Sequence, residues 1–527
     1  MRIPHGFRRG VLAGSTAALL IFLSVLLPPV IPGAFAGRSQ NPVVSLTILH
    51  VNDTHGHIVP FSPFVGKILD HGRKVGGAAY LATMIETQRA KNPQGTILLS
   101  AGDMFQGTPE SNVFHGKPVV EIMNYLHFDA MALGNHEFDW GQGVLHSIIS
   151  WASFPVISAN ITTPEGGPIE GVKPYIILQR KGVRIAVIGL TTPTTRYTTK
   201  PENVADLTFS SPSSVMPSLI REVRAKGASI VIALTHLGLN SDEQLAGQVR
   251  GIDLIVGGHS HTVVMDPVVE SGTVIVQAGS YGRYLGVMKI SFDPETKKIL
   301  TFTRQNELVA VSPQAAPPDP EVARIVDKYE AKIQAEFSKT IGTAAVDLRR
   351  DSAEESNLGD LIADAMRDAS GAQIAFENNG GIRDNIPAGP ITLNEVFTTL
   401  PFDDNIVSMT LSGKQVREAI ERSAAYGRIS LQVSGIQIVF DLSKPPGERA
   451  VSIKVGGKPL DEGATYRVAT NDFLASGGDR FEVFKQGRDI STGQSLRDAV
   501  AQYIGNNSPV KTGGAGRIIL REGGGSH

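Results

Sequence analysis

Residues 46–55 have the sequence Leu-Thr-Ile-Leu-His-Val-Asn-Asp-Thr-His, in which an apolar run leads directly into polar side chains. Short runs rich in Val, Ile and Leu are typical of strands buried in an α/β core. The same unit, an apolar run followed by a polar turn that contains glycine, recurs as far as Gly279. The other predicted strands are residues 96–99, 130–133, 184–190, 230–234, 254–256 and 273–276.

Polar clusters follow five of the predicted strands in this half of the chain. They are Asn52-Asp53-Thr54-His55, Gly102-Asp103, Gly134-Asn135-His136-Glu137-Phe138-Asp139, Thr235-His236 and Gly257-Gly258-His259-Ser260-His261. Ligand sites in open α/β sheets assemble at the C-terminal edge of the strands, so these clusters can converge on one site. Asp, His and Asn supply oxygen and nitrogen ligands for divalent metals, and one carboxylate can bridge two ions. Two ions about 3.5 to 4 Å apart would generate a hydroxide and stabilise both oxygens of an in-line displacement, which suits phosphoester hydrolysis.

Each cluster has a simpler interpretation when it is taken alone. An Asp-x-His after a strand is more often a capped turn, and Gly-Asn-His can be a tight turn with a hydrogen-bonded histidine. The occurrence of all five clusters at one kind of structural position favours the two-metal interpretation. The remaining histidines of this half lack the pattern and are expected at the surface or in packing. They are His50, His57, His71, His115, His127 and His146.

The bulk composition limits the classes of partner. Acidic and basic residues number 51 and 49, so the net charge of −2 offers no patch typical of proteins that bind nucleic acid or an anionic membrane. Small-molecule partners are therefore expected, and the oligomeric state is left open. The chain has no cysteine, so any metal must be held by oxygen and imidazole ligands.

The first residues are typical of a targeting segment. Arg2, Arg8 and Arg9 precede an apolar stretch from Val11 to Ile31, and the small-residue site Ala34-Phe35-Ala36 follows. We predict a signal peptide over residues 1–36 and export to the periplasm, the cell wall or the extracellular medium. A retained membrane anchor is the alternative, because the apolar stretch is nearly long enough to span a bilayer. Three prolines and the cleavage-site pattern favour processing, so no stable membrane anchor is expected.

At 527 residues the chain is too long for one core, and two domains are expected. The segment 315–320 interrupts the strand pattern, and Asp319 followed by Pro320 is a typical helix start. Apolar residues then recur at helical spacing up to Phe337. We predict a phosphoesterase domain over 43–312, a linker helix within 313–339 and a C-terminal domain of mixed strands and helices over 340–522.

Sets of short strings resemble a known family. ILHVNDTHG, SAGDMFQGT, ALGNHEFDWG, THLG and GGHSH together resemble the calcineurin-like metallophosphoesterases. NLGDLIADAM, ENNGGIRDNI, LPFDDNIV and NDFLASGGDRF resemble the exported 5′-nucleotidases, which add a C-terminal nucleotide-binding domain. The resemblance covers nearly all of the chain after residue 36. It implies an α/β protein with an N-terminal calcineurin-like sandwich and a mixed α/β nucleotide-binding domain, joined by a helix.

The resemblance also implies roles for individual residues. One of two divalent ions, such as Zn, Mn or Co, would be held by Asp53, His55, Asp103 and His261, and the other by Asp103, Asn135, His236 and His259. Asp103 would bridge the two ions. His261 stands where several relatives have an amide side chain, which leaves the metal preference open. His136 resembles the catalytic histidine of the family, and Asp139 would orient it; a carboxylate partner also fixes the tautomer of an imidazole on chemical grounds.

In the C-terminal half the resemblance implies a nucleotide site. The base would lie between Phe402 and Phe473, with Asp479 on the ribose and with Asn378 and Arg383 on polar groups of the nucleotide. Aromatic faces accept any base, although two separate phenylalanines are by themselves more typical of a core. A second arginine of the family falls at Ser352 here, and the sequence leaves open whether Arg349 or Arg350 replaces it.

The implied activity is hydrolysis of nucleoside 5′-monophosphates, with nucleoside di- and triphosphates or UDP-sugars as further candidate substrates. The enzymes that hydrolyse 2′,3′-cyclic nucleotides and 3′-nucleotides are one alternative, although relatives there tend to have tyrosines at the stacking positions. A related two-metal hydrolase that acts on a sulfur compound is a second. An exported nucleotide-binding or adhesion protein without activity is a third, and the complete set of predicted metal residues argues against it.

Overall fold

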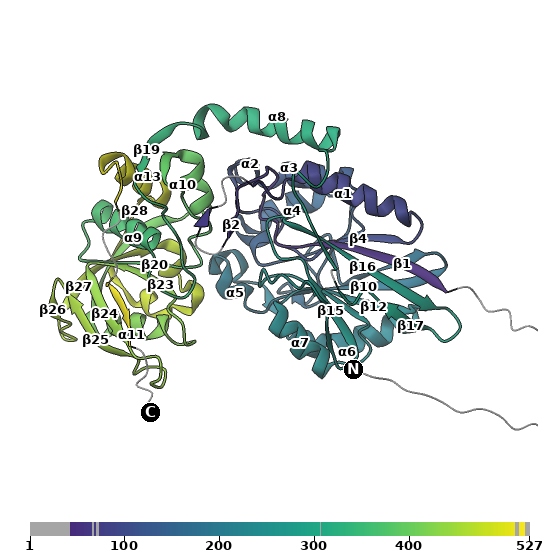
Figure 1. Cartoon of the computed structure of the whole chain (residues 1–527). Coiled ribbons are helices and arrows are strands. Elements are labelled where there is room, and N and C mark those ends of the chain that lie inside the picture. The colour runs from purple at the N-terminus through teal and green to yellow at the C-terminus, as the bar shows by residue number, and fades with distance from the viewer. Residues whose placement is uncertain (1–42, 66–67, 70–72, 306, 512–515, 522–527) are drawn as a thin grey trace, which may run out of the picture. The chain divides into compact units, whose positions relative to one another are not determined.

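The computed structural model describes residues 43–65, 68–69, 73–305, 307–511 and 516–521. The predicted signal peptide and His71 lie outside the described residues. Figure 1 labels the elements of the described chain, and in the N-terminal half it shows two sheets with helices on their outer faces. No helix of the described residues is long and apolar enough to cross a membrane.

The first sheet of the N-terminal half has the strand order β17-β16-β1-β4-β5-β6-β8, with β18 also paired to β16. Its strands are β1 (Val44–Val51), β4 (Thr96–Ser100), β5 (Ala130–Ala132), β6 (Val156–Ile157), β8 (Val172–Lys173), β16 (Tyr284–Asp293), β17 (Lys298–Phe302) and β18 (Leu308–Ala310). Since β1, β4, β5 and β6 are parallel neighbours, their carboxyl ends meet at one edge of the sheet.

The second sheet has the order β14-β15-β13-β12-β10-β9. Its strands are β9 (Tyr175–Arg180), β10 (Val183–Thr191), β12 (Ile230–His236), β13 (Leu254–Gly257), β14 (Val268–Glu270) and β15 (Thr273–Gln277). The strands β10, β12, β13 and β15 are parallel neighbours. All seven strands predicted from apolar runs are therefore present, and one of them, β12, extends through the polar pair Thr235-His236.

The alternation of side chains along β1 explains the sandwich. Leu46 and Ile48 pack in a cluster with residues of the second sheet such as Val187 and Ile232. Leu49 and Val51 point to the opposite face and pack with the helices. Both faces of β1 are buried, which accounts for its nearly continuous apolar run.

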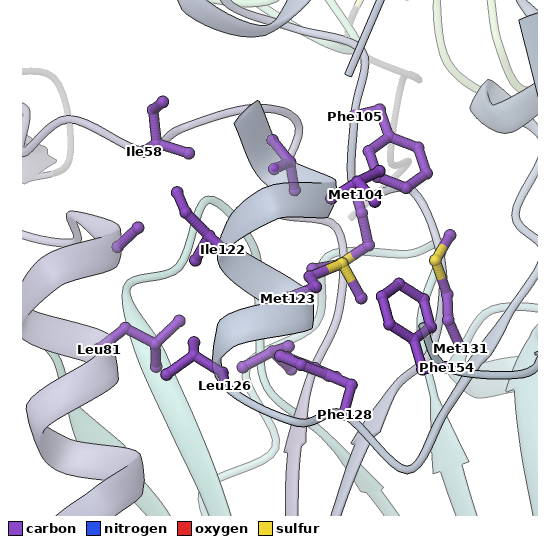
Figure 2. Packing of buried hydrophobic residues seen from close by; sticks show 14 of the residues in the cluster. Ile58, Leu81, Met104, Phe105, Ile122, Met123, Leu126, Phe128, Met131 and Phe154 are labelled. Carbon is purple, nitrogen blue, oxygen red and sulfur yellow. The ribbon is translucent and has the colours of Figure 1, made fainter. Parts of the chain in front are cut away.

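Helices cover the outer faces of both sheets. They are α1 (Ala78–Lys91), α2 (Pro109–Asn112), α3 (Lys117–Tyr125), α4 (Gly141–Trp151), α5 (Thr195–Thr198), α6 (Pro212–Ala225) and α7 (Leu239–Gln248), with the short 3-10 turns η1 (His136–Phe138) and η2 (Pro201–Val204). Figure 2 shows Leu81 of α1, Ile122 and Met123 of α3 and Met131 of β5 in the cluster on the first sheet. The helix α6 buries Ile220 and Val223 against the second sheet. Two small pairs complete this half: β2 (Phe64–Val65) with β3 (Ile68–Leu69), and β7 (Ile161–Thr162) with β11 (Thr208–Phe209).

The helix α8 (Pro320–Phe337) begins as the sequence predicts. The side chain of Asp319 accepts hydrogen bonds from the backbone N–H groups of Glu321 and Val322, and Pro320 occupies the first helical position. Apolar residues on one face of the helix, among them Val322, Ile325 and Tyr329, pack in the cluster on the first sheet.

The C-terminal half contains two further sheets. The first has the order β23-β20-β27-β22-β28 and the second β26-β25-β24-β29. The strands are β20 (Ile374–Asn378), β22 (Asn405–Ser412), β23 (Leu431–Ser434), β24 (Ile436–Phe440), β25 (Ala450–Val455), β26 (Lys458–Pro459), β27 (Thr465–Asn471), β28 (Arg488–Ser495) and β29 (Ile518–Leu520), with the separate pair β19 (Thr340–Ala344) and β21 (Gly389–Thr392). The helical elements are α9 (Asn357–Ser370), α10 (Leu393–Thr399), α11 (Gly413–Ser423), α12 (Asp472–Ala475), α13 (Leu496–Asn506), η3 (Gly478–Arg480) and η4 (Glu482–Gln486). This half is the mixed α/β unit that the sequence predicts.

Candidate metal centre and substrate cavity

The loops after β1, β4 and β13 hold polar residues in an unusual backbone conformation. Asp53, His55, Asp103, His259 and His261 all have positive φ, between 47° and 78°. This region is unfavourable for residues other than glycine, and it persists only where surrounding structure holds the backbone there. Five of the seven predicted metal residues share the feature. Backbone strain concentrated in this way is typical of a functional site.

The first group of converging side chains comprises Asp53, His55 and His261, whose ligand atoms lie within 4.8 Å of one another. His55 Nδ1 lies 2.8 Å from the carbonyl oxygen of Gln106, to which it donates, so His55 Nε2 presents a lone pair. That Nε2 lies 3.1 Å from His261 Nε2. Two imidazole nitrogens this close to a buried carboxylate form a set of donors suited to a cation.

The second group comprises Asp103, His236 and His259, again within 4.8 Å. His236 Nδ1 donates to the carbonyl oxygen of Ala101 at 2.7 Å, and His236 Nε2 lies 3.0 Å from Asp103 Oδ2. Burial works to lower the pKa of His236, but Asp103 outweighs it and raises that pKa to about 10. A cation bound between the two side chains would displace this proton.

Asn135 contributes an amide oxygen to the same region. Its Nδ2 donates to the carbonyl oxygen of Thr198 at 3.2 Å, whereas its Oδ1 is buried without a hydrogen-bond partner. An unpaired buried carbonyl oxygen is costly unless a cation or water satisfies it. The donor set of oxygens and imidazoles therefore fits a pair of divalent ions.

Asp103 lies between the two groups. Its Oδ2 is 3.0 Å from His236 Nε2 and 3.9 Å from His55 Nε2, so a single oxygen faces both groups. Its Oδ1 accepts a hydrogen bond from the backbone N–H of His136 at 2.9 Å. A carboxylate in this position would be able to bridge two cations.

Glu137 is a buried residue that the sequence did not single out. Its carboxylate accepts hydrogen bonds from the backbone N–H groups of Asp103, Met104 and Gly134, at 2.9, 2.9 and 2.7 Å. Burial and the nearby Asp103 raise the pKa of Glu137 to about 7. Glu137 thus ties the loop after β4 to the loop after β5 and fixes the direction of Asp103. Its position inside the GNHE string was the available signal.

Glycine is required where these loops approach one another. A Cβ atom at Gly134 would lie 2.1 Å from Asp103 Oδ1, and one at Gly258 would lie 2.8 Å from the carbonyl oxygen of Ala101. Both contacts are closer than side chains tolerate. The glycines in the GNH and GGH strings therefore permit the convergence of the polar groups.

His136 and Asp139 form a hydrogen-bonded pair beside the two groups. Nδ1 of His136 lies 2.7 Å from Oδ2 of Asp139 and, because a carboxylate only accepts, the ring nitrogen donates. Burial works to lower the pKa of His136, but Asp139 and Asp103 outweigh it and raise that pKa. The pairing fixes the tautomer, and the imidazole remains on the wall of the cavity.

A single cavity of about 210 Å³ connects the polar groups with the C-terminal half. Among its lining residues are Asp103, Asn135, His136, Asp139, His259, His261, Asn378, Arg383, Phe402, Phe473 and Asp479. Asp53, His55 and His236 lie behind this wall and are almost fully buried. The five residues predicted to bind nucleotide thus share a cavity with the predicted catalytic pair.

The C-terminal wall is organised by hydrogen bonds. Asn378 Nδ2 donates to Asp479 Oδ2 at 3.1 Å, and Asn471 Nδ2 donates to Asn378 Oδ1 at 2.9 Å. Burial raises the pKa of Asp479 to about 6. Asp479 has a φ of 49°, so its backbone also lies in the unfavourable region.

The aromatic and cationic residues lie close to the metal groups. Phe402 is 5.5 Å from the ring of His136, centre to centre. Arg383 Nη2 lies 3.3 Å from His55 Nε2, and its guanidinium is 5.9 Å from the ring of Phe402. Neither Arg349 nor Arg350 is among the residues that line the cavity.

Sequence reasoning also missed Thr199, Lys200 and Tyr281. The first two line the cavity but come from a segment with no motif. Tyr281 lies 5.5 Å from His261 and stacks on His57 at 4.2 Å, so His57 packs as the sequence analysis expected. His50 is likewise buried and contacts Glu307 at 2.6 Å.

The comparisons with known proteins agree with this geometry. Residues 46–263 match the calcineurin-like phosphoesterase family, and residues 336–486 match the 5′-nucleotidase C-terminal domain. The chain is 32% identical to the 5′-nucleotidase of Homo sapiens over 568 residues, which covers 98% of this chain and 96% of that protein. The chain belongs to the 5′-nucleotidase family. It is an enzyme of the metal-dependent phosphoric ester hydrolases, and it contains two candidate metal-binding groups.

One further relative and two solved structures are similar to this chain. The trifunctional nucleotide phosphoesterase protein YfkN of Bacillus subtilis is 33% identical over 84% of this chain, which spans 32% of that protein. The crystal structure of a 5′-nucleotidase precursor from Thermus thermophilus superimposes with a TM-score of 0.84, at 35% identity over 90% of this chain and 99% of that one. A sulfate thiohydrolase of Thermus thermophilus has a TM-score of 0.78 at 20% identity over 90% of this chain and 96% of that one, which shows a shared fold.

Proposed function

We propose that this enzyme hydrolyses nucleoside 5′-monophosphates to nucleoside and phosphate. One observation carries the proposal: the two candidate metal groups, the His136–Asp139 pair and the five predicted nucleotide residues all border or adjoin one cavity. A phosphate at the metal end and a base at the aromatic end would then belong to a single bound molecule. Nucleoside di- and triphosphates and UDP-sugars are further candidate substrates.

We assign one ion to Asp53, His55, Asp103 and His261, and the other to Asp103, Asn135, His236 and His259. The convergence of these side chains and the unpaired buried oxygen Oδ1 of Asn135 support the assignment. Bound divalent ions would supply a nucleophile at neutral pH and neutralise charge on the phosphoryl oxygens.

The protein itself would orient the substrate and move a proton. His136 is well placed to donate to a phosphoryl or leaving-group oxygen as negative charge develops there, because Asp139 stabilises its protonated form. Arg383 would pair with the phosphate, since it lies beside His55 at the metal end.

The nucleoside would occupy the other end of the cavity. Phe402 and Phe473 offer apolar faces that accept any base, and this supports activity on several nucleosides. The Asp479 carboxylate can accept hydrogen bonds from ribose hydroxyls, and Asn378 fixes its position at 3.1 Å.

The division into a phosphoesterase domain (43–312), a linker helix (313–339) and a nucleotide-binding domain (340–522) is part of the proposal. So is export after removal of residues 1–36, to the periplasm, the cell wall or the medium. The two family matches begin and end inside the proposed domains, apart from residues 336–339.

A turnover assay tests the function. AMP, 3′-AMP, 2′,3′-cyclic AMP, UDP-glucose and a thiosulfate-type substrate should be compared at equal enzyme concentration, with and without added divalent metal. We expect AMP to give the highest kcat/KM of the panel and a chelator to remove activity. Preference for the cyclic or sulfur substrate would contradict the proposal.

A further inference from the structure

The segment 197–200 contacts both ends of the cavity, although no motif marks it. On one side, Thr199 Oγ1 donates to Asp139 Oδ1 at 2.8 Å, and the carbonyl oxygen of Thr198 accepts from Asn135 at 3.2 Å. Both carboxylate oxygens of Asp139 are therefore engaged, one by Thr199 and the other by His136. Thr199 is almost fully buried, with 2% of its surface exposed.

On the other side, Lys200 contacts the residues that flank both stacking phenylalanines. Its Nζ donates to the carbonyl oxygen of Asp403, directly after Phe402, at 3.0 Å and lies 3.5 Å from the carboxylate of Asp404. It also lies 3.2 Å from the carboxylate of Asp472, directly before Phe473. One ammonium group thus contacts both the loop that carries Phe402 and the helix α12 that carries Phe473.

Lys200 opposes the unfavourable approach of two neighbouring carboxyl groups. Asp404 is buried, and burial together with the nearby Asp472 raises the pKa of Asp404 to about 8, an effect that Lys200 counteracts. Without a cation between them, the two carboxyl groups would face each other in a poorly solvated region, which is unfavourable. Next to this contact, the guanidinium of Arg480 lies 4.8 Å from the ring of Tyr197.

We propose that the segment 198–200 couples nucleoside binding to chemistry in this enzyme. Thr199 is a positioning residue that holds Asp139, and through it His136. Lys200 holds the loop of Phe402 and the start of α12, which carries Phe473, against the same segment. A base seated between the two rings would therefore stabilise the arrangement in which His136 is oriented for phosphoryl transfer. The inference rests on the proposed nucleotidase function and deepens it.

The Thr199 contact is tested with Thr199→Val, which keeps the shape and removes the hydroxyl donor. We expect kcat to fall about tenfold on both AMP and p-nitrophenyl phosphate, with KM changed less than about twofold, because one hydrogen bond to a charged group is lost. Thr199→Ser should restore kcat. Thr199→Ala repeats the test with a smaller side chain if the valine variant does not fold. A rise in KM with kcat unchanged, or failure of serine to restore activity, would overturn this step.

The Lys200 contact is tested by a double-mutant cycle on the metal-loaded enzyme. We expect Lys200→Met to lower kcat/KM for AMP about tenfold and to lower p-nitrophenyl phosphate hydrolysis much less. In the Phe473→Ala background, which lacks one stacking face, the same change should cost less than about twofold on AMP. Lys226→Met, which breaks an exposed ion pair with Glu222, is the matched control and should leave both rates unchanged.

Two outcomes would overturn the coupling. One is an equal loss on both substrates in Lys200→Met, which would make Lys200 a residue that only maintains the fold. The other is a tenfold loss that persists in the Phe473→Ala background. Failure of the proposed function would appear differently, as a wild-type enzyme that does not prefer AMP to p-nitrophenyl phosphate. In that case the role of Thr199 in positioning Asp139 could still be tested by measuring kcat of the Thr199 variants on p-nitrophenyl phosphate alone.

Discussion

The two ends of the cavity are built in different ways. At the metal end, Asp53, Asp103 and His236 are almost fully buried, and they lie on strand ends or on loops held in strained conformations. At the other end, Phe402 lies on the loop before β22 and Phe473 lies on α12, and both side chains are half-buried. The groups that would perform chemistry are thus almost fully buried, whereas the rings that would select the substrate are partly exposed. Substitutions at the metal end should abolish turnover, and substitutions at the end with Phe402 and Phe473 should alter the substrate preference.

The largest effect should come from Asp103→Ala. Removing the carboxylate between the two metal groups leaves two cations without their shared counter-charge, so we expect turnover to fall to background and bound metal to decrease. Metal analysis together with AMP kinetics is the measurement. Asp368→Ala, at an exposed position on α9, is the matched control. Two retained ions with near-normal activity would remove the bridging assignment.

His136→Ala should be the next most damaging change. The proposed proton donation acts in the transition state, so kcat should fall about 10²- to 10⁴-fold while KM changes little. The metal content should stay at the wild-type level, because His136 is not among the proposed ligands. His146→Ala, an exposed histidine on α4, provides the control. A rise in KM with kcat unchanged would mean that His136 contributes only to substrate binding.

Glu137→Ala tests whether the metal end depends on its supporting hydrogen bonds. Three backbone N–H groups would lose their acceptor, and each unsatisfied buried group costs about 1 to 3 kcal/mol. We expect a lower melting temperature and a metal affinity reduced about 10- to 100-fold, since supporting residues of metal sites have effects of that size. Calorimetry and metal titration measure the two quantities. Unchanged metal affinity would show that the loops hold Asp103 without Glu137.

The metal end was predictable because its signals are local. Each polar cluster follows an apolar run in the sequence, and parallel strands bring such clusters to one edge. The same locality revealed the start of α8 at Asp319. Glu137 lies in the GNHE string, but two of the N–H groups that it binds, those of Asp103 and Met104, belong to a different loop, and spacing along the chain does not show those contacts.

The other end of the cavity, where the nucleoside would bind, was predictable only through the family resemblance. Phe402 and Phe473 are separated by about seventy positions, and spacing alone cannot show that they border the same cavity as His136. Thr199 and Lys200 were not predicted at all, because their contacts with Asp139 and Asp472 join segments far apart in the sequence. Side chains that meet only through tertiary packing leave no periodic signal in the chain.

The smallest and most selective effect should come from Phe473→Ala. Loss of one stacking face costs about 1 to 3 kcal/mol of base binding, so kcat/KM for AMP should fall roughly ten- to a hundredfold. Hydrolysis of p-nitrophenyl phosphate, which has no base, should fall much less. Phe302→Ala removes a half-buried ring on β17 that does not line the cavity, and it should affect neither substrate selectively.

The ratio of the activity on AMP to the activity on p-nitrophenyl phosphate, rather than either activity alone, decides this prediction. Phe473 contacts the backbone at Gly478, where a Cβ atom would lie 2.5 Å from its ring, so truncation could also loosen the loop that carries Asp479. Loosening would lower binding of the ribose and the base together, and it would leave the selective loss on AMP intact. Equal losses on both substrates would instead mean that Phe473 supports the fold of the whole cavity. In that case the cavity would not be divided into an end that performs catalysis and an end that selects the substrate. Only the proposed two-metal phosphoesterase activity would remain supported.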